Sequence, residues 1–366
     1  MSNGLRAVSL FSGAGGLDVG FERAGYQTIW ANEFDHDAAE AWRANRPDNA
    51  VAMVEGDINE HLSELDALRG KVDVLFGGPP CQGFSVAGKM DPNDQRSTLV
   101  WSFMEAVDRV RPHVFLIENV AALARLEKWR SVRDGIVARA DELGYDCTWR
   151  VHLASDYGVP ERRERVMFVG VEKGGVPAEE IYEALRAYEK QPRTVRDVLT
   201  SVGAYGTDEN PQTCSSHVSL AKSPVMRKSP YAGMLVNGAG RPMNLDGCAP
   251  TLPASMGGNK TPIIDQTALE DPARENWFVS YHRRLLDGEA DPATETVPDA
   301  ARRLTIAEAA AIQTFPRDYV FAGRKTKQYR QIGNAVPCGL AEAMASAIYD
   351  CFFSSPSIRA FSSSSC

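Results

Sequence analysis

Residues 7–16 have the sequence AVSLFSGAGG, in which the apolar run Ala7–Leu10 leads directly into a turn that contains three glycines. The residues from Leu17 to Ala24 then have the spacing of an amphipathic helix, and Gly25 follows them. A buried strand, a glycine-rich turn and a helix form the first half of a βαβ unit. This stretch therefore predicts an α/β fold in which further strands and helices alternate along the chain.

Apolar runs and helical segments alternate up to about residue 170. Apolar runs at Val72–Phe76, which only Asp73 interrupts, and at Val114–Ile117 are typical of strands that are buried on both faces of a sheet, and a further strand is expected at Val166–Val171. A shorter strand is expected at 50–54, and the segment 98–110 has apolar side chains at helical spacing. The pattern indicates a mainly parallel, doubly wound sheet with right-handed crossovers.

The composition changes after residue 190. From there to about residue 300 the chain is rich in Pro, Gly, Ser, Thr and Asn, and long apolar runs are few. Residues 211–245 contain no Asp or Glu and four basic side chains, Lys222, Arg227, Lys228 and Arg241. A long loop-rich insertion and a small second domain with a basic face both fit this composition. More than about 100 structureless residues in a compact protein would be unusual, which favours the second domain.

The overall composition excludes several classes of protein. A chain of 366 residues with 43% hydrophobic and 24% charged residues is neither disordered nor fibrous over most of its length. No apolar run approaches the roughly 18 residues of a membrane span, and the first residues lack the pattern of a secretory signal. Seven cysteines without a Cys-x-x-Cys pair argue against a disulfide framework or a metal site and favour the cytoplasm. The net charge of −8 leaves room for a local basic cleft.

Two acidic positions suggest that the glycine-rich turn binds a ligand. A backbone without side chains at a helix N-terminus can approach a bound molecule closely. Glu33 follows the second expected strand, where an acidic side chain accepts hydrogen bonds from both ribose hydroxyls. Asp57 follows the third strand and could accept from an adenine amine, while Ile58 packs on the ring. An ordinary tight turn with two surface carboxylates is the alternative.

The fourth strand ends in Gly77-Gly78-Pro79-Pro80-Cys81, and this loop offers a thiol to a ligand. The two prolines fix the backbone, so that Cys81 is held at the carboxyl edge of the sheet, where ligands of open α/β sheets bind. Cysteine is more often a small buried residue without a chemical role. The rigid loop nevertheless favours a nucleophile.

Charged residues at the ends of later strands could assist such a nucleophile. Glu118 follows the strand after Cys81 at the same sheet edge, and partial burial would raise its pKa enough for a proton donor. Helix capping is the alternative role for Glu118. Arg163 and Arg165 have the same parity in an extended segment and suit a phosphate or a base carbonyl. A solvated run of charges paired with neighbouring glutamates is the alternative there.

Together these segments resemble the DNA (cytosine-5) methyltransferase family in its prokaryotic, restriction–modification form. Six short motifs stand in the order in which the family has them, on both sides of a variable insert. They are Phe11-x-Gly13-x-Gly15-Gly16, Pro80-Cys81-Gln82, Glu118-Asn119-Val120, Glu161-Arg162-Arg163-Glu164-Arg165, Arg302-x-Leu304-Thr305-x-x-Glu308 with Gln313-x-Phe315-Pro316, and Gln331-Ile332-Gly333-Asn334-Ala335-Val336-Pro337.

The resemblance implies a Rossmann-like S-adenosylmethionine-dependent methyltransferase fold. Residues 1–190 and 321–366 would form the catalytic domain, and residues 191–320 a smaller inserted target-recognition domain. The residues implied to bind S-adenosylmethionine are Phe11, Gly13, Gly15, Glu33, Asp57, Ile58, Leu99, Asn334 and Val336. Thr251 and Leu252 resemble the Thr-Leu pair of such recognition domains. They are expected to contact DNA together with Arg163, Arg165, Lys222, Arg227, Lys228 and Arg241.

The resemblance also implies a mechanism. The enzyme would transfer a methyl group to C5 of cytosine in a specific duplex sequence, after flipping the base out of the stack. The Cys81 thiolate would add to C6 while Glu118 protonates N3. Arg163 would steady O2 of the base, and Arg165 would hold the neighbouring phosphate. The partners implied are duplex DNA and a separately acting cognate restriction endonuclease, and the protein is expected to be a monomer.

Two departures from the family pattern and three rival functions are left open by the sequence. Cys338 stands where a second proline is common, which matters less than the other departure. Glu161 replaces the family's glutamine and puts an acid where a neutral donor would approach DNA. The first rival is a methyltransferase acting on transfer RNA, whose branch usually has a Cys-Phe-Thr tripeptide that the insert lacks. The second is a catalytically silent DNA-binding module. The third is a nicotinamide-dependent oxidoreductase, against which the irregular spacing of the glycine loop argues.

Overall fold

The computed structural model describes residues 4–80 and 99–353. The chain divides into two compact units. The first consists of Met1–Gly158, Glu164–Gln191 and Ala335–Cys366, and the second of Val159–Arg163 and Pro192–Asn334. The second unit therefore extends beyond the insert expected at 191–320. Its role as a target-recognition domain stays a prediction.

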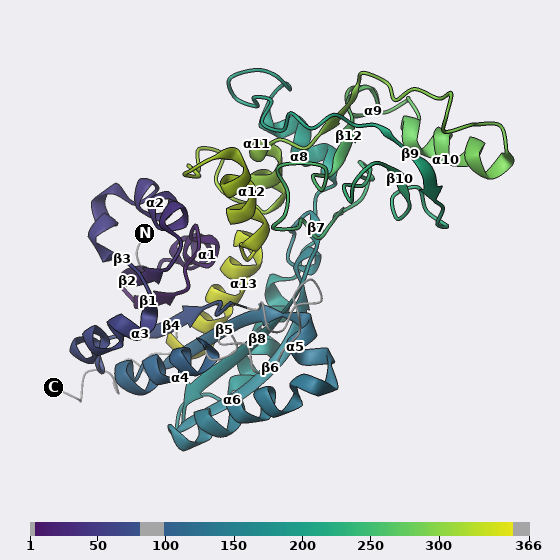
Figure 1. Ribbon diagram of the computed structural model, residues 1–366. Coiled ribbons are helices and arrows are strands. Elements are labelled where there is room, and N and C mark those ends of the chain that lie inside the picture. The colour runs from purple at the N-terminus through teal and green to yellow at the C-terminus, as the bar shows by residue number, and fades with distance from the viewer. Residues whose placement is uncertain (1–3, 81–98, 354–366) are drawn as a thin grey trace. The chain divides into compact units, whose positions relative to one another are not determined.

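The first unit is built on a mainly parallel sheet, as the apolar runs predict (Figure 1). Its seven described strands lie in the order β3-β2-β1-β4-β5-β8-β6, and only β8 runs antiparallel to its neighbours. The strands are β1 (Arg6–Leu10), β2 (Gln27–Glu33), β3 (Met53–Glu55), β4 (Val74–Gly77), β5 (Val114–Val120), β6 (Tyr145–Leu153) and β8 (Glu164–Glu172). The strand expected at 50–54 begins only at Met53, because Pro47 starts a 3₁₀ helix that runs to Ala52.

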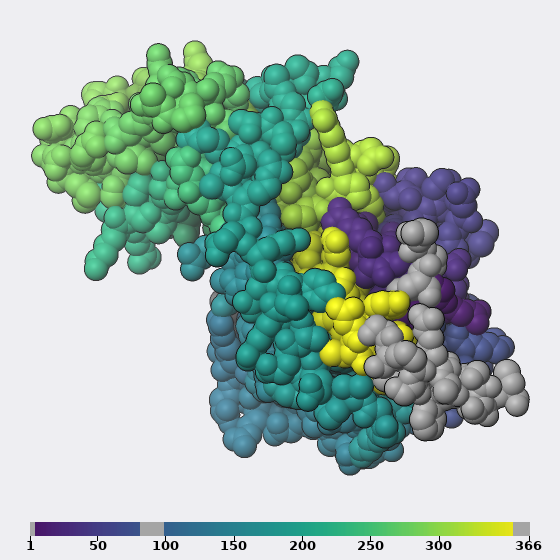
Figure 2. Space-filling view, turned by 180° about the vertical axis from the view of Figure 1, so that it is seen from behind, coloured from purple at the N-terminus to yellow at the C-terminus, as the bar shows by residue number. Residues whose placement is uncertain are grey.

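Helices cover both faces of this sheet. One face carries α1 (Gly16–Arg23), α13 (Cys338–Ile348) and α7 (Ala178–Leu185). Figure 2 shows this C-terminal segment in yellow against the N-terminal segment in purple. The other face carries α4 (Leu99–Val110) and α6 (Arg130–Glu142), which bury a continuous apolar core with alternate residues of the central strands. The shorter helices of the unit are α2 (His36–Ala44), α3 (Ile58–His61) and α5 (Ala121–Arg125).

The second unit consists of short elements around a small core of its own, which includes Val236, Ile263 and Phe278. Its strands form the pairs β7 (Glu161–Arg162) with β11 (Ala249–Pro250), β9 (Leu220–Val225) with β10 (Met234–Val236), and β12 (Ile263–Asp265) with β13 (Ala301–Arg303). Its helices are α8 (Val195–Val202), α9 (Gln266–Glu270), α10 (Trp277–Asp287), α11 (Ile306–Ile312) and α12 (Lys325–Asn334). Residues 192–334 are therefore not a structureless loop.

A buried ion pair explains the motif at Arg302–Glu308. The Arg302 guanidinium donates to both carboxylate oxygens of Glu308, at 2.9 and 2.6 Å. Glu308 also accepts from the Thr305 amide at 2.9 Å, and the Thr305 hydroxyl accepts from the Glu308 amide at 3.1 Å. This reciprocal pair is a capping box that begins α11. The motif therefore has a structural role in the second unit.

The described helices include none that is both long enough and apolar enough to cross a membrane.

Candidate active site

The glycine-rich turn after β1 is tied to the end of β2 by Glu33. Phe11, Gly13 and Gly15 have positive φ angles of 53°, 56° and 90°, so the chain turns sharply before α1. The Gly13 amide donates to Glu33 Oε2 at 2.7 Å, and the Asp35 amide donates to Oε1 at 2.8 Å. Burial raises the pKa of the Glu33 carboxyl. A carboxylate has about four acceptor positions, so Glu33 can also accept hydroxyl groups of a ligand at this turn.

Phe34 was not identified from the sequence as a site residue. It follows Glu33 directly, and 75% of its surface is exposed, although large aromatic side chains are usually buried. The signal that could have found it is its position, since an aromatic residue next to the acid after the second strand can offer a ring face to the same ligand. Phe34 therefore joins Glu33 as a candidate ligand contact.

Asp57 and Ile58, the two candidate residues after β3, have different surroundings. The Asp57 carboxylate caps α3 by accepting from the amide and from the side-chain Nδ2 of Asn59, both at 2.9 Å. Ile58 is buried in the core beneath α4, and Leu99, the first described residue of α4, packs against the same core. The Ile58 side chain, which was expected to pack on the adenine ring, therefore packs in the core and supports the site from below.

The C-terminal motif returns to the glycine-rich turn inside the first unit. The Val336 carbonyl lies so close to Gly16 that a Cβ atom on that glycine would stand 2.6 Å from the carbonyl oxygen. Only glycine allows this approach, which explains the last glycine of the turn. Val336 is buried, while Asn334 is exposed and belongs to the second unit.

The proposed nucleophile Cys81 lies outside the described residues, but the strand end that leads to it is described. The side-chain Nδ2 of Asn119 donates to the Pro79 carbonyl at 3.1 Å. Asn119, the second residue of the Glu118-Asn119 motif, therefore fixes the backbone at Pro79, two positions before Cys81.

Glu118 and Arg165 form a close ion pair at the same sheet edge. Antiparallel pairing of β5 with β8 sets Val120 opposite Arg165, and the distance from Arg165 Nε to Glu118 Oε1 is 2.6 Å. Each residue is 8% exposed. A Cβ atom on Gly78 would lie 2.8 Å from Glu118 Oε2, so the carboxylate covers the loop three positions before Cys81. The arrangement places an acid and a cation beside the predicted nucleophile loop.

One family of known proteins matches almost the whole chain. The model of the family described as C-5 cytosine-specific DNA methylase matches residues 5–350. The chain belongs to this family.

Related bacterial enzymes cover most of the chain. The methyltransferase is 36% identical to the Type II methyltransferase M.PspPI of Psychrobacter sp., over 93% of this chain and 78% of the relative. It is 32% identical to the Type II methyltransferase M1.HphI of Haemophilus parahaemolyticus, over 94% and 86% of the two chains. The methyltransferase is thus an enzyme that methylates C5 of cytosine in DNA with S-adenosylmethionine, of the restriction–modification type.

Solved structures share the fold. A DNA modification methyltransferase encoded within an E. coli prophage matches with a TM-score of 0.63 and 24% identity, over 95% of this chain and 99% of that one. S. pombe Dnmt2 methyltransferase matches with a TM-score of 0.63 and 16% identity, over 94% and 98%. At these identities the likeness supports the methyltransferase fold alone.

Arg163 occupies a different environment from Arg165 in the methyltransferase. It belongs to the second unit, where it is 1% exposed. Its Nη1 donates to the Leu252 carbonyl at 3.2 Å, and its Nη2 donates to the Gly333 carbonyl at 2.8 Å. The two arginines therefore do not form a single exposed pair, and Arg163 connects backbone segments.

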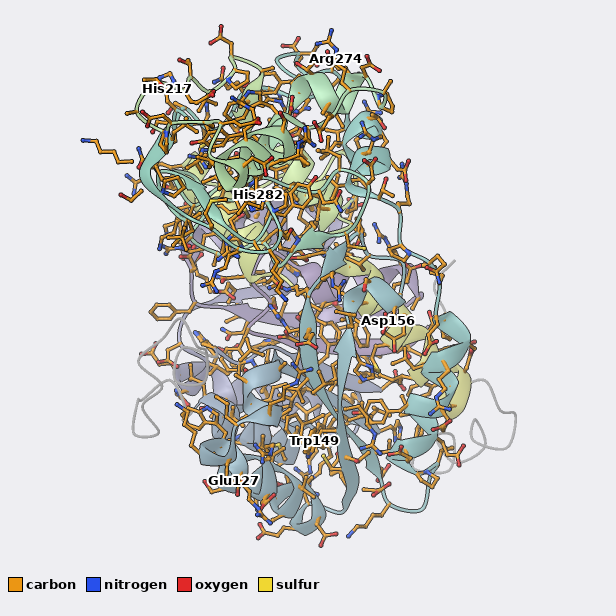
Figure 3. The ribbon with its side chains drawn as sticks, turned by 90° about the vertical axis from the view of Figure 1, so that its right-hand side faces the viewer. Glu127, Trp149, Asp156, His217, Arg274 and His282 are labelled. Carbon is orange, nitrogen blue, oxygen red and sulfur yellow. The ribbon has the colours of Figure 1, made fainter. Side chains whose placement is uncertain are left out.

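The residues expected to contact DNA differ in exposure. Lys222, Arg227, Lys228 and Arg241 are exposed, and none of them forms an ion pair with another described residue. His282 of α10, labelled in Figure 3, is buried in the second unit and donates from Nε2 to the Arg227 carbonyl at 2.8 Å, which fixes the loop after β9. Thr251 is exposed, whereas Leu252 is wholly buried, so the Leu252 side chain anchors the Thr-Leu pair from the interior.

Three side chains on the surface of the first unit are of types that bind metal ions, but a cation of the protein already pairs with the two acids among them. The ligand atoms of His36, Glu40 and Glu55 lie within 4.8 Å of one another. Arg43 donates to Glu40 at 2.7 Å and to Glu55 at 3.0 Å, so a cation already balances these acids. We assign no metal to this group.

Proposed function

We propose that Glu118 and Arg165 act together on a cytosine that has been flipped out of a specific duplex sequence. The observation that carries this proposal is their ion pair over Gly78, at the end of the strand that leads to Cys81. Flipping the base costs a few kcal/mol, and it is required because the target carbon is inaccessible inside a stacked duplex.

S-adenosylmethionine fits the turn between β1 and α1. The Glu33 carboxylate faces the turn with acceptor capacity to spare, and Phe34 offers an exposed ring beside it. When bound, this donor supplies an electrophilic methyl group carried by a sulfonium. We assign its binding to residues of the first unit, Phe11, Gly13, Gly15, Glu33, Asp57 and Val336, with Phe34 in addition and with Ile58 and Leu99 as supports from the core.

The geometry leads us to change the roles expected for both arginines. Atoms N3 and O2 of cytosine are attached to the same carbon, so a group that holds O2 must lie beside the group that holds N3. Arg165 lies beside Glu118, and we therefore assign O2 to Arg165. The hydrogen bonds of Arg163 to two backbone carbonyls make it a positioning residue.

The chemical steps follow from these assignments. In its ion pair with Arg165, Glu118 is a carboxylate, so it first takes up a proton from solvent. The Cys81 thiolate then adds to C6 while Glu118 gives this proton to N3, because the ring is a poor electrophile without it. Addition makes C5 nucleophilic, and C5 takes the methyl group. Loss of the C5 proton to a water molecule, elimination of the Cys81 sulfur and return of the N3 proton to Glu118 then release 5-methylcytosine and restore the thiolate and the acid.

We also propose the partners of the enzyme. Duplex DNA binds to exposed basic residues of the second unit, which offset part of the cost of base flipping through phosphate contacts. A cognate restriction endonuclease acts separately on the same sequence, as the Type II names of the relatives suggest. The methyltransferase works as a monomer in the cytoplasm, where it associates with the nucleoid when it is bound to DNA.

Labelled methyl transfer tests the proposed function. The enzyme is given duplex DNA or transfer RNA, and the modified positions in the DNA are found by bisulfite sequencing. We expect 5-methylcytosine in one duplex sequence, and covalent trapping on the same duplex with 5-fluorocytosine at the target. Methylation of transfer RNA alone, or trapping that persists in Cys81→Ser, would refute the proposal.

A further inference from the structure

Glu161, which departs from the family pattern, is buried in the second unit. It begins β7, which pairs in parallel with β11, and its side chain is wholly buried. Glu161 Oε1 accepts from the Leu252 amide at 2.5 Å and lies 3.7 Å from Arg163 Nη1. The acid therefore does not occupy the exposed position where a neutral donor was expected to approach DNA.

Glu161 and Arg163 hold the same residue from two sides. The Leu252 amide donates to Glu161, and the Leu252 carbonyl accepts from Arg163. The other end of the Arg163 guanidinium holds Gly333. Three segments that are distant in the sequence, at 161–163, 249–254 and 333, are therefore joined through two buried charged side chains. Charge-assisted hydrogen bonds are strong in a buried environment. Those from the Leu252 amide to Glu161 and from Arg163 to the Gly333 carbonyl are also short, at 2.5 and 2.8 Å.

Because these hydrogen bonds join the three segments, the position of Thr251 is fixed. Leu252 is buried and both of its peptide groups are held, while Thr251 next to it is exposed. The Thr251 hydroxyl donates to the Arg162 carbonyl at 3.0 Å, so it is turned along the β7 backbone. A residue that is held on one side by a rigid neighbour and exposed on the other is suited to a defined contact with a partner.

We infer that Glu161 is a positioning residue for DNA binding, which holds Thr251 in the orientation in which it meets the duplex. The inference rests on the proposed function, in which Thr251 contacts DNA. The essential property of Glu161 is the reach of its carboxylate oxygen to the Leu252 amide, because that bond fixes the backbone beside Thr251.

Two conservative variants separate the effect of the length of the Glu161 side chain from the effect of its charge. Glu161→Asp keeps the negative charge beside Arg163 but is one methylene too short for the Leu252 amide. Glu161→Gln keeps an acceptor oxygen at the same reach and loses the charge. We expect Glu161→Asp to raise the KM for duplex DNA about tenfold, as the loss of one buried hydrogen bond implies, with kcat and the KM for S-adenosylmethionine nearly unchanged. Glu161→Gln should stay within about threefold of the parent KM.

Glu308→Asp is the matched control, because it shortens the acid of another buried ion pair in the same unit. It should leave the KM for DNA within about threefold of the parent value. A second test places Glu161→Asp in a Thr251→Ala background. The effect of Glu161→Asp on the KM should fall to less than about threefold there, because both changes act through the same contact.

Three results would overturn the inference. The first is a larger rise of KM in Glu161→Gln than in Glu161→Asp, which would show that the charge matters and the reach does not. The second is an equal rise in Glu308→Asp, and the third is full additivity with Thr251→Ala. Failure of the parent enzyme to methylate DNA would instead refute the proposed function, so the two failures are distinguishable.

Discussion

At the scale of single residues, the ion pair between Glu118 and Arg165 makes the clearest chemical prediction. Glu118→Gln should lower kcat at least about a hundredfold, because an amide cannot give N3 the proton that a general acid supplies. Single-turnover methyl transfer onto duplex DNA measures this step. Glu164→Gln is the control, since Glu164 lies next to Arg165 but pairs with Arg125 at the surface. Near-normal turnover in Glu118→Gln would contradict the assigned role.

A second residue-scale prediction concerns Phe34, the exposed aromatic beside Glu33. Phe34→Ala should raise the KM for S-adenosylmethionine about tenfold, because stacking of a base on an aromatic ring is worth roughly 1–3 kcal/mol. Phe34→Tyr should restore the parent value. Val51→Ala removes another exposed apolar side chain from the same unit and should change nothing. Equal KM values for the parent and Phe34→Ala would exclude a ligand contact.

At the scale of elements, the sequence predicted the strands, because a strand is indicated by residues that are neighbours in the chain. The apolar runs at Val72–Phe76 and Val114–Ile117 predicted β4 and β5, because strands buried on both faces leave a continuous apolar signal. The partner of Glu118 was not predictable, since it depends on the antiparallel register that sets Val120 opposite Arg165. The place of Glu161 was also hidden, because it accepts from a residue 91 positions away.

The start of α11 supports a prediction about stability. Glu308→Ala should lower the free energy of unfolding by about 3–5 kcal/mol, because it leaves the buried Arg302 guanidinium without its carboxylate and removes the capping box. Urea unfolding of the full chain measures the loss. Glu275→Ala breaks the exposed ion pair with Arg283 in the same unit and should have little effect. Equal losses in the two variants would mean that burial of the pair is unimportant.

At the scale of the whole molecule, charge is distributed unevenly. The chain carries 48 acidic and 40 basic residues, yet residues 211–245 contain no acid and four exposed bases. A negative protein repels DNA over most of its surface, so attraction must come from local clusters such as this one. The exposed bases of this segment form no ion pair with described residues, which leaves their charge for phosphate.

The dependence of DNA binding on salt tests this distribution of charge. Each phosphate that a lysine or arginine neutralises contributes about 0.9 to the slope of log K against log salt, because counterions are released from the duplex. Arg227→Ala should therefore weaken binding about equally on all sequences and lower the slope by about 1, as should Lys222→Ala. Arg283→Ala is the control, because its guanidinium is held by Glu275 at 2.8 Å and has less charge to offer DNA. Fluorescence anisotropy with a labelled duplex, between low and physiological salt, gives the slope.

Two outcomes would contradict this distribution of charge. An unchanged slope in Arg227→Ala and Lys222→Ala would place the phosphate contacts on another surface. A loss of sequence preference without a change of slope would show that these residues contact bases and not phosphates.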